Sequence, residues 1–543
     1  MPVHAGRPRR EEELTDTGRA LARHPFAFQR RTALQASCGV FFLWVGAFGC
    51  GAPPDSVPST VRDALTIAVP EGTVAGTDLG IRQVMATLSL EGLTQLSEDG
   101  RVVPRLAEKW VWENGGTQLR VTLREEITFH DGTPLTSALA AGILRDAIAR
   151  PGNQSLYSSF GDVTAIKVDG SRQLIFEVKQ PSFFLPENLE IPLALAPQNV
   201  GTGPYRVVKT ESSEIVLERF DKYQAGSPQI RSVVIRSFQT LRTAWTNLLR
   251  GDVDMVSNVP PEAVEFISND DIQVVSFLRH YQLMVAFNSK TPQFRSSAVR
   301  RALNVAIDRP SLIKNVLQGR GLPATGPLWP KHWAIDAGVA PYRFDPGLAA
   351  SLLPQADLNA APQSKVPNAR LRFVCLIPAN FTLLERVALE VQKQLYRAGV
   401  DMQFEVVPSA DFVSRVNDGR FEAILIDMIS GPTLERGYLF WRSARNFKGL
   451  FNTFGYENAG AERVFDVLRV SSNEAAVRSA TSRLQQILLE DPPALFLAWT
   501  ERTRAVSKNF SIVQESGRDP IDPLYTIWRW TAADRRQVSA ETP

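Results

Sequence analysis

Histidine, cysteine and serine are the residues whose spacing would reveal a metal site or a nucleophilic site in this chain. Of the five histidines, His130, His280 and His332 lie beyond the first fifty residues, and none has the short spacing of paired metal ligands. The sequence contains no G-x-S-x-G, no H-E-x-x-H and no paired metal-type cysteines. We therefore predict no metal, no cofactor and no catalytic residues.

Two short motifs resemble chemical sites at first sight. His130 and Asp131 in "FHDGT" are adjacent side chains before an Asp-Gly turn, so they do not converge on one substrate atom. The glycines of "VGTGPYRVV", residues 200–208, could cradle a phosphate, but Pro204 lacks an amide donor and a strand follows instead of a helix. We predict a structural histidine at the first motif and a tight turn into a β-strand at the second.

The charge of the chain lies mainly in its first fifty residues. The whole chain of 543 residues has a formal net charge of +3. Residues 1–50 hold seven arginines and four acidic residues, so the remainder is formally neutral. A neutral body offers no attractive surface to a polyanion, and we predict no nucleic-acid partner.

Residues 1–50 have the pattern of an export leader. Residues 32–49 carry no charge and directly follow Arg30 and Arg31, as in the n-region and h-region of a secretory signal. The apolar core is shorter than the roughly 20 residues of a bilayer span, so an uncleaved anchor is the less favoured alternative. The arginine pair also resembles a twin-arginine signal, which leaves the export route open.

Cys50 ends the apolar run, and residues 51–60 form a small, polar, proline-rich tether. The sequence "AFGC" resembles a bacterial lipobox, so we expect Cys50 to be the lipid-modified residue that attaches the protein to the membrane. An ordinary signal with a chance cysteine is the alternative. Cys375 lies alone in the strand-like "LRFVCLIP", where we expect it to be a core residue.

The elements that follow the tether indicate an α/β fold. "LTIAV" at 65–69 predicts a strand, and alternating apolar residues predict strands of a small sheet at 118–125 and 172–180. Residues 296–308 have helical periodicity behind a serine cap, with Arg309-Pro310 as the stop. Ser311 is then expected to cap a second short helix, which Gly319 closes.

The segment 371–427 predicts a βαβ unit. Strand "LRFVCLIP" precedes a helix that ends at Gly399, and strand "VDMQFEVV" precedes a helix around 412–416 and strand "FEAILIDM". Parallel strands require such crossover helices, so this segment indicates a parallel α/β domain.

Four ordered motifs resemble one protein family over residues 61–530. They are "EGLTQLSEDGRVVPRLAEKWVWENGGTQLRVTLREEITFHDGTPLTS", "GTGPYRVV" with "LERFDKYQAGSP", "LLRGDVDMV", and "VAFNSKTPQFRSSAVRRALNVAIDRPSLI". The chain is similar to the solute-binding proteins of peptide-type ABC importers, which include oligopeptide-, dipeptide- and nickel-binding proteins.

The resemblance implies a two-lobed periplasmic-binding-protein (clamshell) fold. The first lobe would comprise 61–265 plus 500–530, with a small subdomain at about 91–185, and the second lobe would comprise 266–499. A ligand would bind between the lobes and be delivered to an ABC permease with its ATPase. We expect an extracytoplasmic monomer, in the periplasm or cell envelope.

The peptide-binding members of this family hold a free amine with the aspartate of a W-x-x-D-x-x-x-P pattern. With Pro432 as the anchor, Leu425 occupies the tryptophan position and Met428 the aspartate position. Asp427 is adjacent, but successive residues of a strand face opposite sides. The departure leaves open a ligand without a free amine, such as a sugar-like or apolar solute.

Other candidate ligand contacts are aromatic residues near loops and strand ends. With the two strand residues above, the predicted ligand-binding set is Tyr281, Trp329, Asp427, Met428, Tyr438, Trp441 and Tyr525. Trp333 lies in the same loop as Trp329. Glu435 and Arg436 are interpreted as a solvated surface pair rather than a replacement for the missing aspartate.

These observations favour a solute-binding protein that performs no catalytic step. One alternative keeps the fold but makes the protein an envelope sensor or interaction module. The other is a hydrolase that uses carboxylates of the cleft, which ligand turnover would reveal.

Overall fold

The structure is a computed structural model, and it describes residues 63–70, 80–267, 269–353, 364, 366, 369–443, 452–471 and 473–533. The leader, Cys50 and the whole tether lie outside the described residues. The described residues form one compact unit. Among the described helices, none has the length and apolar character of a membrane span.

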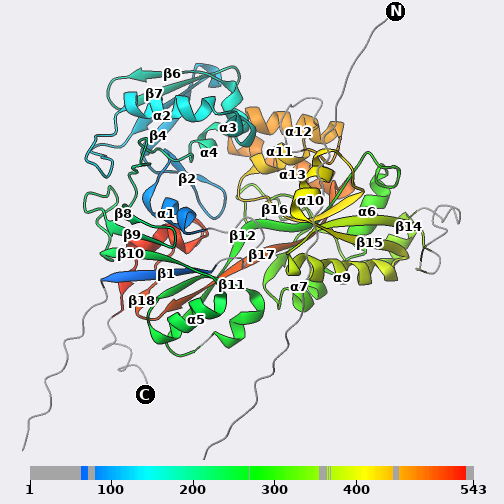
Figure 1. The fold of residues 1–543 in the computed structure, drawn as a ribbon. Helices are drawn as coiled ribbons and strands as arrows, with labels where there is room; N and C mark the ends of the chain where they lie inside the picture. The colour runs from blue at the N-terminus through cyan, green and yellow to red at the C-terminus, as the bar shows by residue number, and fades with distance from the viewer. Residues whose placement is uncertain are drawn as a thin grey trace, which may run out of the picture. The chain divides into compact units, whose positions relative to one another are not determined.

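One large sheet of 11 strands organises the fold (Figure 1). Its order is β15-β14-β16-β12-β17-β11-β1-β10-β9-β8, and β13 also pairs with β17. The strands are β1 Ala64–Pro70, β8 Tyr205–Thr210, β9 Glu214–Arg219, β10 Ser232–Phe238, β11 Met255–Val259, β12 Ile272–Phe287, β13 Gly321–Pro323, β14 Leu371–Pro378, β15 Val400–Val407, β16 Ala423–Ile429 and β17 Ala494–Ser507.

The long strands β12 and β17 join two lobes. β12 has 16 residues and β17 has 14, and they pair with each other in antiparallel fashion. The second half of β12 pairs with β16, and the second half of β17 pairs with β11. We call β1 and β8–β11 with their helices the first lobe, and β14–β16 with theirs the second lobe. The register of the β12–β17 pairing shifts near Gln282, where β12 crosses from one lobe to the other.

Both lobes contain parallel strands, as the sequence predicted for the second. β1 is parallel to β10 and β11, and β14 is parallel to β15 and β16. The predicted strand at 65–69 and the βαβ unit at 371–427 are confirmed, with α9 Thr382–Arg397 and α10 Ser409–Asn417 as its helices. Cys375 is fully buried in the core, as expected.

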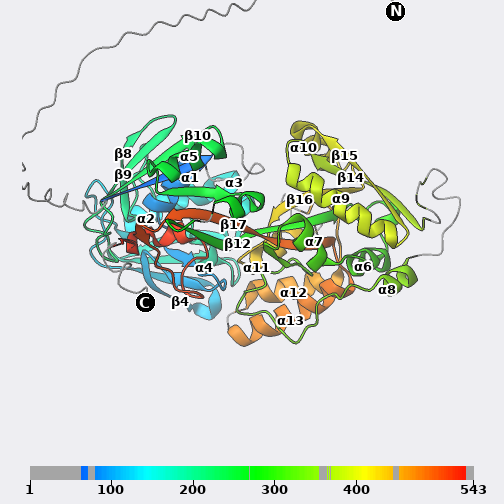
Figure 2. The same ribbon diagram turned by 90° about the horizontal axis from the view of Figure 1, so that it is seen from below.

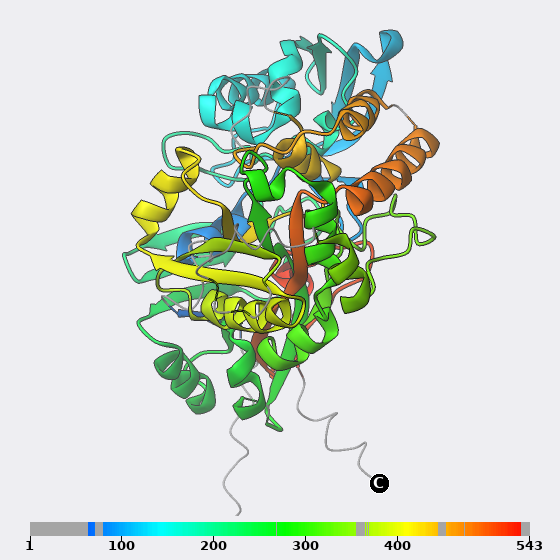
Figure 3. The same cartoon turned by 90° about the vertical axis from the view of Figure 1, so that its right-hand side faces the viewer.

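Helices cover both faces of the sheet. Figures 1 and 2 show α5 of the first lobe and α9 of the second on the same side of the sheet, with α12 and α13 on the other; Figure 3 separates α9 from α12 and α13 in a third view. The main helices are α1 Ile81–Ser89, α5 Leu241–Arg250, α6 Ser297–Val305, α7 Arg309–Val316, α8 Pro346–Leu352, α11 Leu434–Trp441, α12 Ala459–Val470 and α13 Glu474–Glu490. Short 3-10 turns are η1 Asn114–Gly116, η2 Ser158–Asp162, η3 Pro261–Phe266, η4 Pro292–Phe294 and η5 Pro523–Arg529.

A separate four-stranded sheet forms the small subdomain of the first lobe. Its order is β4 Ala107–Glu113, β5 Gln118–Leu123, β7 Gln173–Val178 and β6 Val163–Asp169, and α2 Ser137–Ala149, α3 Pro151–Leu156 and α4 Leu185–Asn188 accompany it. The alternation that predicted β5 is confirmed, since Leu119, Val121 and Leu123 are fully buried. Two further pairs are β2 Thr94–Leu96 with β3 Val102–Pro104, and β18 Phe510–Ser511 with β19 Thr531–Ala532.

Ser296 occupies the predicted N-cap position of α6, but the predicted stop at Arg309-Pro310 and the predicted cap of α7 at Ser311 are wrong. Helix α6 ends at Val305, and the side chain of Ser296 makes no capping hydrogen bond. The carboxylate of Asp308 caps α7, accepting a hydrogen bond of 3.0 Å from the backbone N–H of Ser311. Proline is well tolerated in a first turn, so Pro310 begins this helix instead of ending the one before.

The predicted tight turn into strand β8 is confirmed. The backbone N–H of Gly203 donates to the carbonyl of Ser89 at 3.0 Å, and a Cβ on Gly201 would overlap that same carbonyl oxygen. His130 lies against this turn, with its Nε2 at 2.9 Å from the carbonyl oxygen of Gly203. The glycines permit close backbone approach, and His130 is structural.

Candidate functional site

A cavity of about 540 Å³ lies where the two lobes meet. The first lobe contributes the start of α5 and the segment after β11, and the second lobe contributes the start of α9 and the end of β16. Strands β12 and β17 form the remaining wall, with Arg279 from β12 and Thr500 and Glu501 from β17. The lining residues are Leu241, Asn258, Val259, Pro260, Pro261, Glu262, Arg279, Leu317, Arg320, Asn380, Phe381, Thr382, Leu383, Leu384, Arg386, Asp427, Thr500 and Glu501.

The position of the cavity follows from the direction of the strands. In the first lobe, the parallel strands β10 and β11 end at Phe238 and Val259, next to it. In the second lobe, the parallel strands β14 and β16 end at Pro378 and Ile429. Ligands of open α/β sheets bind outside the carboxyl ends of the strands, and here the carboxyl ends of both lobes face one cavity.

An ion pair lies on the wall formed by β12 and β16. Nη1 of Arg279 is 2.6 Å from Oδ2 of Asp427, and it also donates to the hydroxyl of Thr500 at 3.2 Å. The side chains are 8% and 10% exposed. The guanidinium carbon of Arg279 also lies 4.5 Å from the centre of the Tyr281 ring. Two predicted residues, Tyr281 and Asp427, thus meet at an arginine that the sequence analysis did not select.

The β12–β16 ladder explains why these side chains meet. Tyr281 pairs with Ile429 and Leu283 with Asp427, without a bulge between them. Arg279, Tyr281 and Leu283 have the same parity along β12 and therefore face the same side as Asp427. Met428 faces the opposite side, where it is buried in an apolar cluster.

Three polar atoms of the ion pair have no hydrogen-bond partner within the part of the chain that the structure describes. They are Nε and Nη2 of Arg279 and Oδ1 of Asp427. A buried polar atom without a partner costs about 1 to 3 kcal/mol, and more when the group is charged. Such atoms are uncommon in folded proteins.

The other charged residues of the cavity balance one another. Arg320 and Arg386 line it together with Glu262 and Glu501. Nη1 of Arg386, on α9, is 3.9 Å from Oε1 of Glu262 in the first lobe, so this contact joins the lobes across the cavity. With Arg279 and Asp427 included, the lining carries three arginines and three acidic residues.

The N-terminus of α9 opens into the same cavity. Phe381 is its N-cap residue and provides no side-chain hydrogen bond. The first N–H groups of a helix have no partner within the helix, and they give that end a partial positive charge. Asn380, Thr382 and Leu383 line the cavity around this end.

None of the predicted aromatic residues lines the cavity, and Tyr281 reaches the site only through its contact with Arg279. Trp329 is 1% exposed, donates from Nε1 to the carbonyl of Glu98 at 2.8 Å, and contacts His280 and Trp499 edge-on. Trp441 is equally buried and packs in the core of the second lobe. The structure therefore gives Trp329 and Trp441 packing roles, because each ring is surrounded by other side chains.

Tyr438 and Tyr525 are also outside the lining of the cavity. Tyr438 is fully buried, and its hydroxyl accepts a hydrogen bond of 2.9 Å from Nη1 of Arg469. Tyr525 lies half-buried in η5, where burial raises the pKa of its hydroxyl. Trp333 lies between the guanidinium groups of Arg101 and Arg478, at 4.8 and 5.0 Å from its ring centre.

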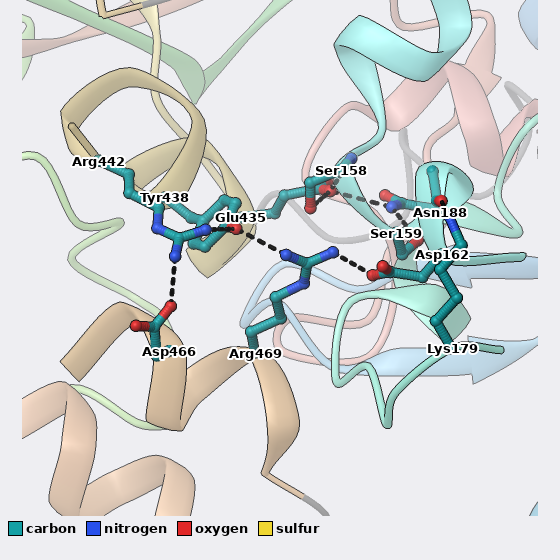
Figure 4. Close-up of polar contacts among 11 residues, drawn as sticks. Ser158, Ser159, Asp162, Lys179, Asn188, Glu435, Tyr438, Arg442, Asp466 and Arg469 are labelled. Atoms are coloured by element: carbon teal, nitrogen blue, oxygen red, sulfur yellow. Dashed lines mark hydrogen bonds and ion pairs between the residues drawn. The ribbon is translucent and has the colours of Figure 1, made fainter. Parts of the chain in front are cut away.

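The interpretation of Glu435 and Arg436 as a solvated surface pair is wrong. Glu435 is 2% exposed, and Oε1 accepts hydrogen bonds from the backbone N–H and the hydroxyl of Ser158, both at 2.6 Å, and from Asn188 at 2.9 Å (Figure 4). These partners belong to the small subdomain, and Glu435 belongs to the second lobe. Glu435 is buried because the two parts of the chain close over it, which the local sequence does not reveal, and Arg436 is half-buried.

The same contact region contains further charged groups. Arg469 of α12 pairs with Asp162 of the small subdomain (Figure 4). Burial raises the pKa of Glu187 and of Glu435, and it raises the pKa of Glu190 to about 7. We call the group Ser158, Asp162, Glu187, Asn188, Glu190, Glu435 and Arg469 the lobe contact.

Arg279, Thr500 and the start of α9 are the features that sequence reasoning missed. A signal for Arg279 does exist, because "RHYQL" places it at alternate positions with Tyr281 and the buried Leu283. A charge that faces the same side as a buried leucine requires a partner. Thr500 and the start of α9 join the site through long-range contacts, for which the local sequence holds no signal.

Comparison with known proteins agrees with this architecture. The family model for bacterial extracellular solute-binding proteins, family 5, matches residues 101–448. The oligopeptide-binding protein AppA of Bacillus subtilis is 23% identical over 470 residues, which cover 81% of this chain and 86% of AppA. The glutathione-binding protein GsiB of Escherichia coli (strain K12) is 25% identical over 468 residues, covering 80% and 89%.

Solved structures share the fold. The complex of NikA from Brucella suis with Fe(III)-EDTA matches with a TM-score of 0.73 at 19% identity and covers 87% of this chain and 100% of NikA. AppA from Bacillus subtilis in complex with a nonapeptide has a TM-score of 0.67 at 21% identity, with 87% and 99% covered. The fold is thus the predicted two-lobed one, and this chain belongs to the bacterial extracellular solute-binding proteins of family 5.

Proposed function

We propose that this protein is the extracytoplasmic solute-binding component of an ABC importer, which binds a peptide or a peptide-sized solute and delivers it to a membrane permease. The observation that carries the proposal is the interlobe cavity, lined by both lobes at the carboxyl ends of their parallel strands. Its volume of 540 Å³ is within the range of about 300 to 1,000 Å³ typical of small-molecule sites.

Ligand-dependent closure is the proposed mechanism. A solute in the cavity contacts the start of α9 in the second lobe and the segment after β11 in the first. These contacts form together when the lobes are closed, so the solute binds the closed state more tightly and shifts the population toward it. We propose lobe boundaries at 61–265 plus 500–530 and at 266–499, with the small subdomain at about 91–185.

The similar proteins support a solute of peptide size. AppA was solved with a nonapeptide, GsiB is named for glutathione, and NikA was solved with Fe(III)-EDTA. We propose that this chain retains its solute without turnover. The ion pair with Arg279 supports this view, because it engages Oδ2 of Asp427.

Attachment to the membrane through a lipid on Cys50, as a monomer, is part of the proposal. Exchange of Cys50 for serine in the full-length chain tests it by phase partitioning of the envelope fraction in detergent. The proposal expects the natural chain in the detergent phase and the variant in the aqueous phase. Equal partitioning would instead favour an ordinary signal.

A ligand screen on the exported, purified protein tests the central function. Di- to pentapeptides, their N-acetylated versions and non-peptide solutes are compared by the rise in melting temperature, which depends on ligand concentration relative to the Kd. We expect at least one class to stabilise the protein and to be recovered unchanged with it. Recovery of cleaved products would favour a hydrolase, and import that persists without the protein would favour a sensor.

A further inference from the structure

We infer that closure of the two lobes takes up one proton, held by the carboxylates of Glu187 and Glu435, which lie on the two sides of the lobe contact. Glu187 belongs to α4 of the first lobe, and Glu435 belongs to α11 of the second. The arrangement in which the lobe contact is formed is called closed. A rise in pH removes the proton and separates the lobes, whatever the cavity binds.

The two carboxylates are enclosed where α4 packs against α11. Asn188, the residue after Glu187, donates from Nδ2 to Oε1 of Glu435 at 2.9 Å (Figure 4). Ser158 of the small subdomain donates to the same oxygen from its backbone N–H and from its hydroxyl. Glu187 is 3% exposed, about as little as Glu435. Opening of the lobes would therefore break these hydrogen bonds and admit water to both carboxylates.

The contact holds too few cations for every carboxylate to be ionised. Arg469 is engaged by Asp162. Arg436 of α11, whose charge acts on both Glu187 and Glu435, is half-buried and forms no ion pair with a described residue. One guanidinium balances one carboxylate, and a second buried negative charge without a partner is costly. One of the two carboxylates therefore holds a proton while the lobes are closed.

Glu187 is the protonated member. Neither of its oxygens has a hydrogen-bond partner within the described residues, whereas Oε1 of Glu435 accepts three hydrogen bonds, which favour the ionised form. Burial raises the pKa of Glu187 well above its ordinary value of 4.5, and the charges of Glu435 and Glu190 add to this effect. Arg436 and the hydroxyl of Thr433, which is near Glu187 without the geometry of a hydrogen bond, act in the opposite direction.

Two other titratable groups lie beside the pair. Burial raises the pKa of Glu190 to about 7, while a backbone hydrogen bond from Leu96 and the charge of Arg436 act against this rise. Tyr157 keeps its proton, because burial raises the pKa of its hydroxyl. Glu190 thus adds a second ionisation, from which that of Glu187 has to be separated by experiment.

The direction of the pH effect follows from which arrangement holds the proton more tightly. In the open arrangement water surrounds Glu187, so its pKa returns toward 4.5, whereas in the closed arrangement the pKa is raised. The contribution to closure is therefore complete below about pH 4.5 and is lost as the pH rises through the raised value. Within that window, one proton changes the closed-to-open ratio by up to about tenfold per pH unit.

Small-angle scattering of the exported chain without solute tests the inference, so its outcome does not depend on the solute-binding function. We expect the radius of gyration to increase between about pH 5 and about pH 8 as the lobes separate. Hydrogen exchange, corrected for the intrinsic effect of pH, supplies a local readout. The backbone N–H of Ser158 should lose protection over the same range, while the N–H groups of the central strand β5 stay protected.

Two variants assign the proton. Glu187→Gln cannot ionise at this position, so it should remain closed and keep Ser158 protected at about pH 8. Glu435→Gln removes the like charge, while its amide oxygen can accept the same hydrogen bonds, and it should weaken the pH response. Glu190→Gln keeps both carboxylates of the pair and should still open as the pH rises. Asp146→Asn, at an exposed position of α2, is the matched control and should behave as the natural chain does.

A radius of gyration and a Ser158 protection that do not change with pH would overturn the inference, and this comparison requires no variant. Loss of protection in β5 together with Ser158 would indicate unfolding instead of lobe opening and would also overturn it. A pH response that persists in Glu187→Gln, or that Glu190→Gln abolishes, would place the proton on another group and contradict the assignment to this pair.

Discussion

Arg279 of β12 and Asp427 of β16 form an ion pair, with 2.6 Å between Nη1 and Oδ2, on the cavity wall between the lobes. The two residues are 148 positions apart in the sequence. β12 is one of the two strands that run from one lobe to the other, so the pair lies where the cavity meets an interlobe strand.

Breaking the pair from one side should destabilise the fold. Arg279→Met leaves a 10% exposed carboxylate without its partner, and we expect a loss of about 3 kcal/mol in the free energy of unfolding in urea. The double variant Arg279→Met/Asp427→Leu should recover most of it. Arg206→Met breaks an exposed pair with Glu218 and should cost less than about 1 kcal/mol. A single variant as stable as the natural chain would contradict a tightly held pair.

The lobe contact should favour the closed arrangement. Arg469→Ala removes the ion pair with Asp162 and the hydrogen bond to Tyr438 (Figure 4). We expect a larger radius of gyration in small-angle scattering and about tenfold weaker solute binding, since a loss of about 1.4 kcal/mol is tenfold. Arg415→Ala, whose Glu405 and Asp411 partners lie in the same lobe, is the control. An unchanged radius and affinity would show that this contact does not influence closure.

Glu190 should make stability fall as pH rises. Burial raises its folded-state pKa to about 7 from 4.5, so the folded protein holds this proton more tightly than the unfolded chain. The contribution to stability is therefore complete below about pH 4.5 and is lost as the pH rises to about 7.

The variant Glu190→Gln removes this dependence. We expect its stability relative to the natural chain to increase between pH 5 and pH 8 by about 1 to 3 kcal/mol, because each pKa unit is worth about 1.4 kcal/mol. Urea unfolding at the two pH values measures it. Glu125→Gln, at an exposed position, is the control. An equal difference at both pH values would count against a raised pKa of Glu190 in the folded protein.

The turn before β8 should not accept a side chain. Gly201→Ala places a methyl group on the Ser89 carbonyl oxygen, and overpacking of this kind costs about 1 to 3 kcal/mol. Gly142→Ala, in the helix α2 with open space around its Cα, should instead be neutral or stabilising. If thermal unfolding gave equal stability for the two variants, the close approach at Gly201 would be wrong.

Elements with a regular apolar pattern could be predicted from the sequence. Leu119, Val121 and Leu123 alternate along β5, and the crossover pattern of 371–427 specified a parallel unit, because local periodicity determines which face is buried. The cap of α7 was predicted wrongly because Ser311 and Asp308 are both good caps, and the geometry of Pro310 selects Asp308.

The composition of the site could be predicted only in part. Asp427 and Tyr281 were selected, but Arg279, which joins them, was not, because its partner lies on a strand distant in the sequence. Glu435 was interpreted as a surface residue because its hydrogen bonds come from Ser158 and Asn188 of another subdomain. Trp441 was selected as a possible contact, yet an aromatic residue has the same local pattern in a core as beside a ligand.

Native mass spectrometry of the exported protein tests the central claim most directly. With the solute that stabilises it best in the ligand screen, the natural chain should show one intact solute per chain. Leu383→Trp, which fills the cavity at the start of α9, should lose it, and Leu389→Trp, 54% exposed on the same helix, should retain it. Solute retained by Leu383→Trp, or converted to products by the natural chain, would contradict a binding protein that holds its cargo between the lobes.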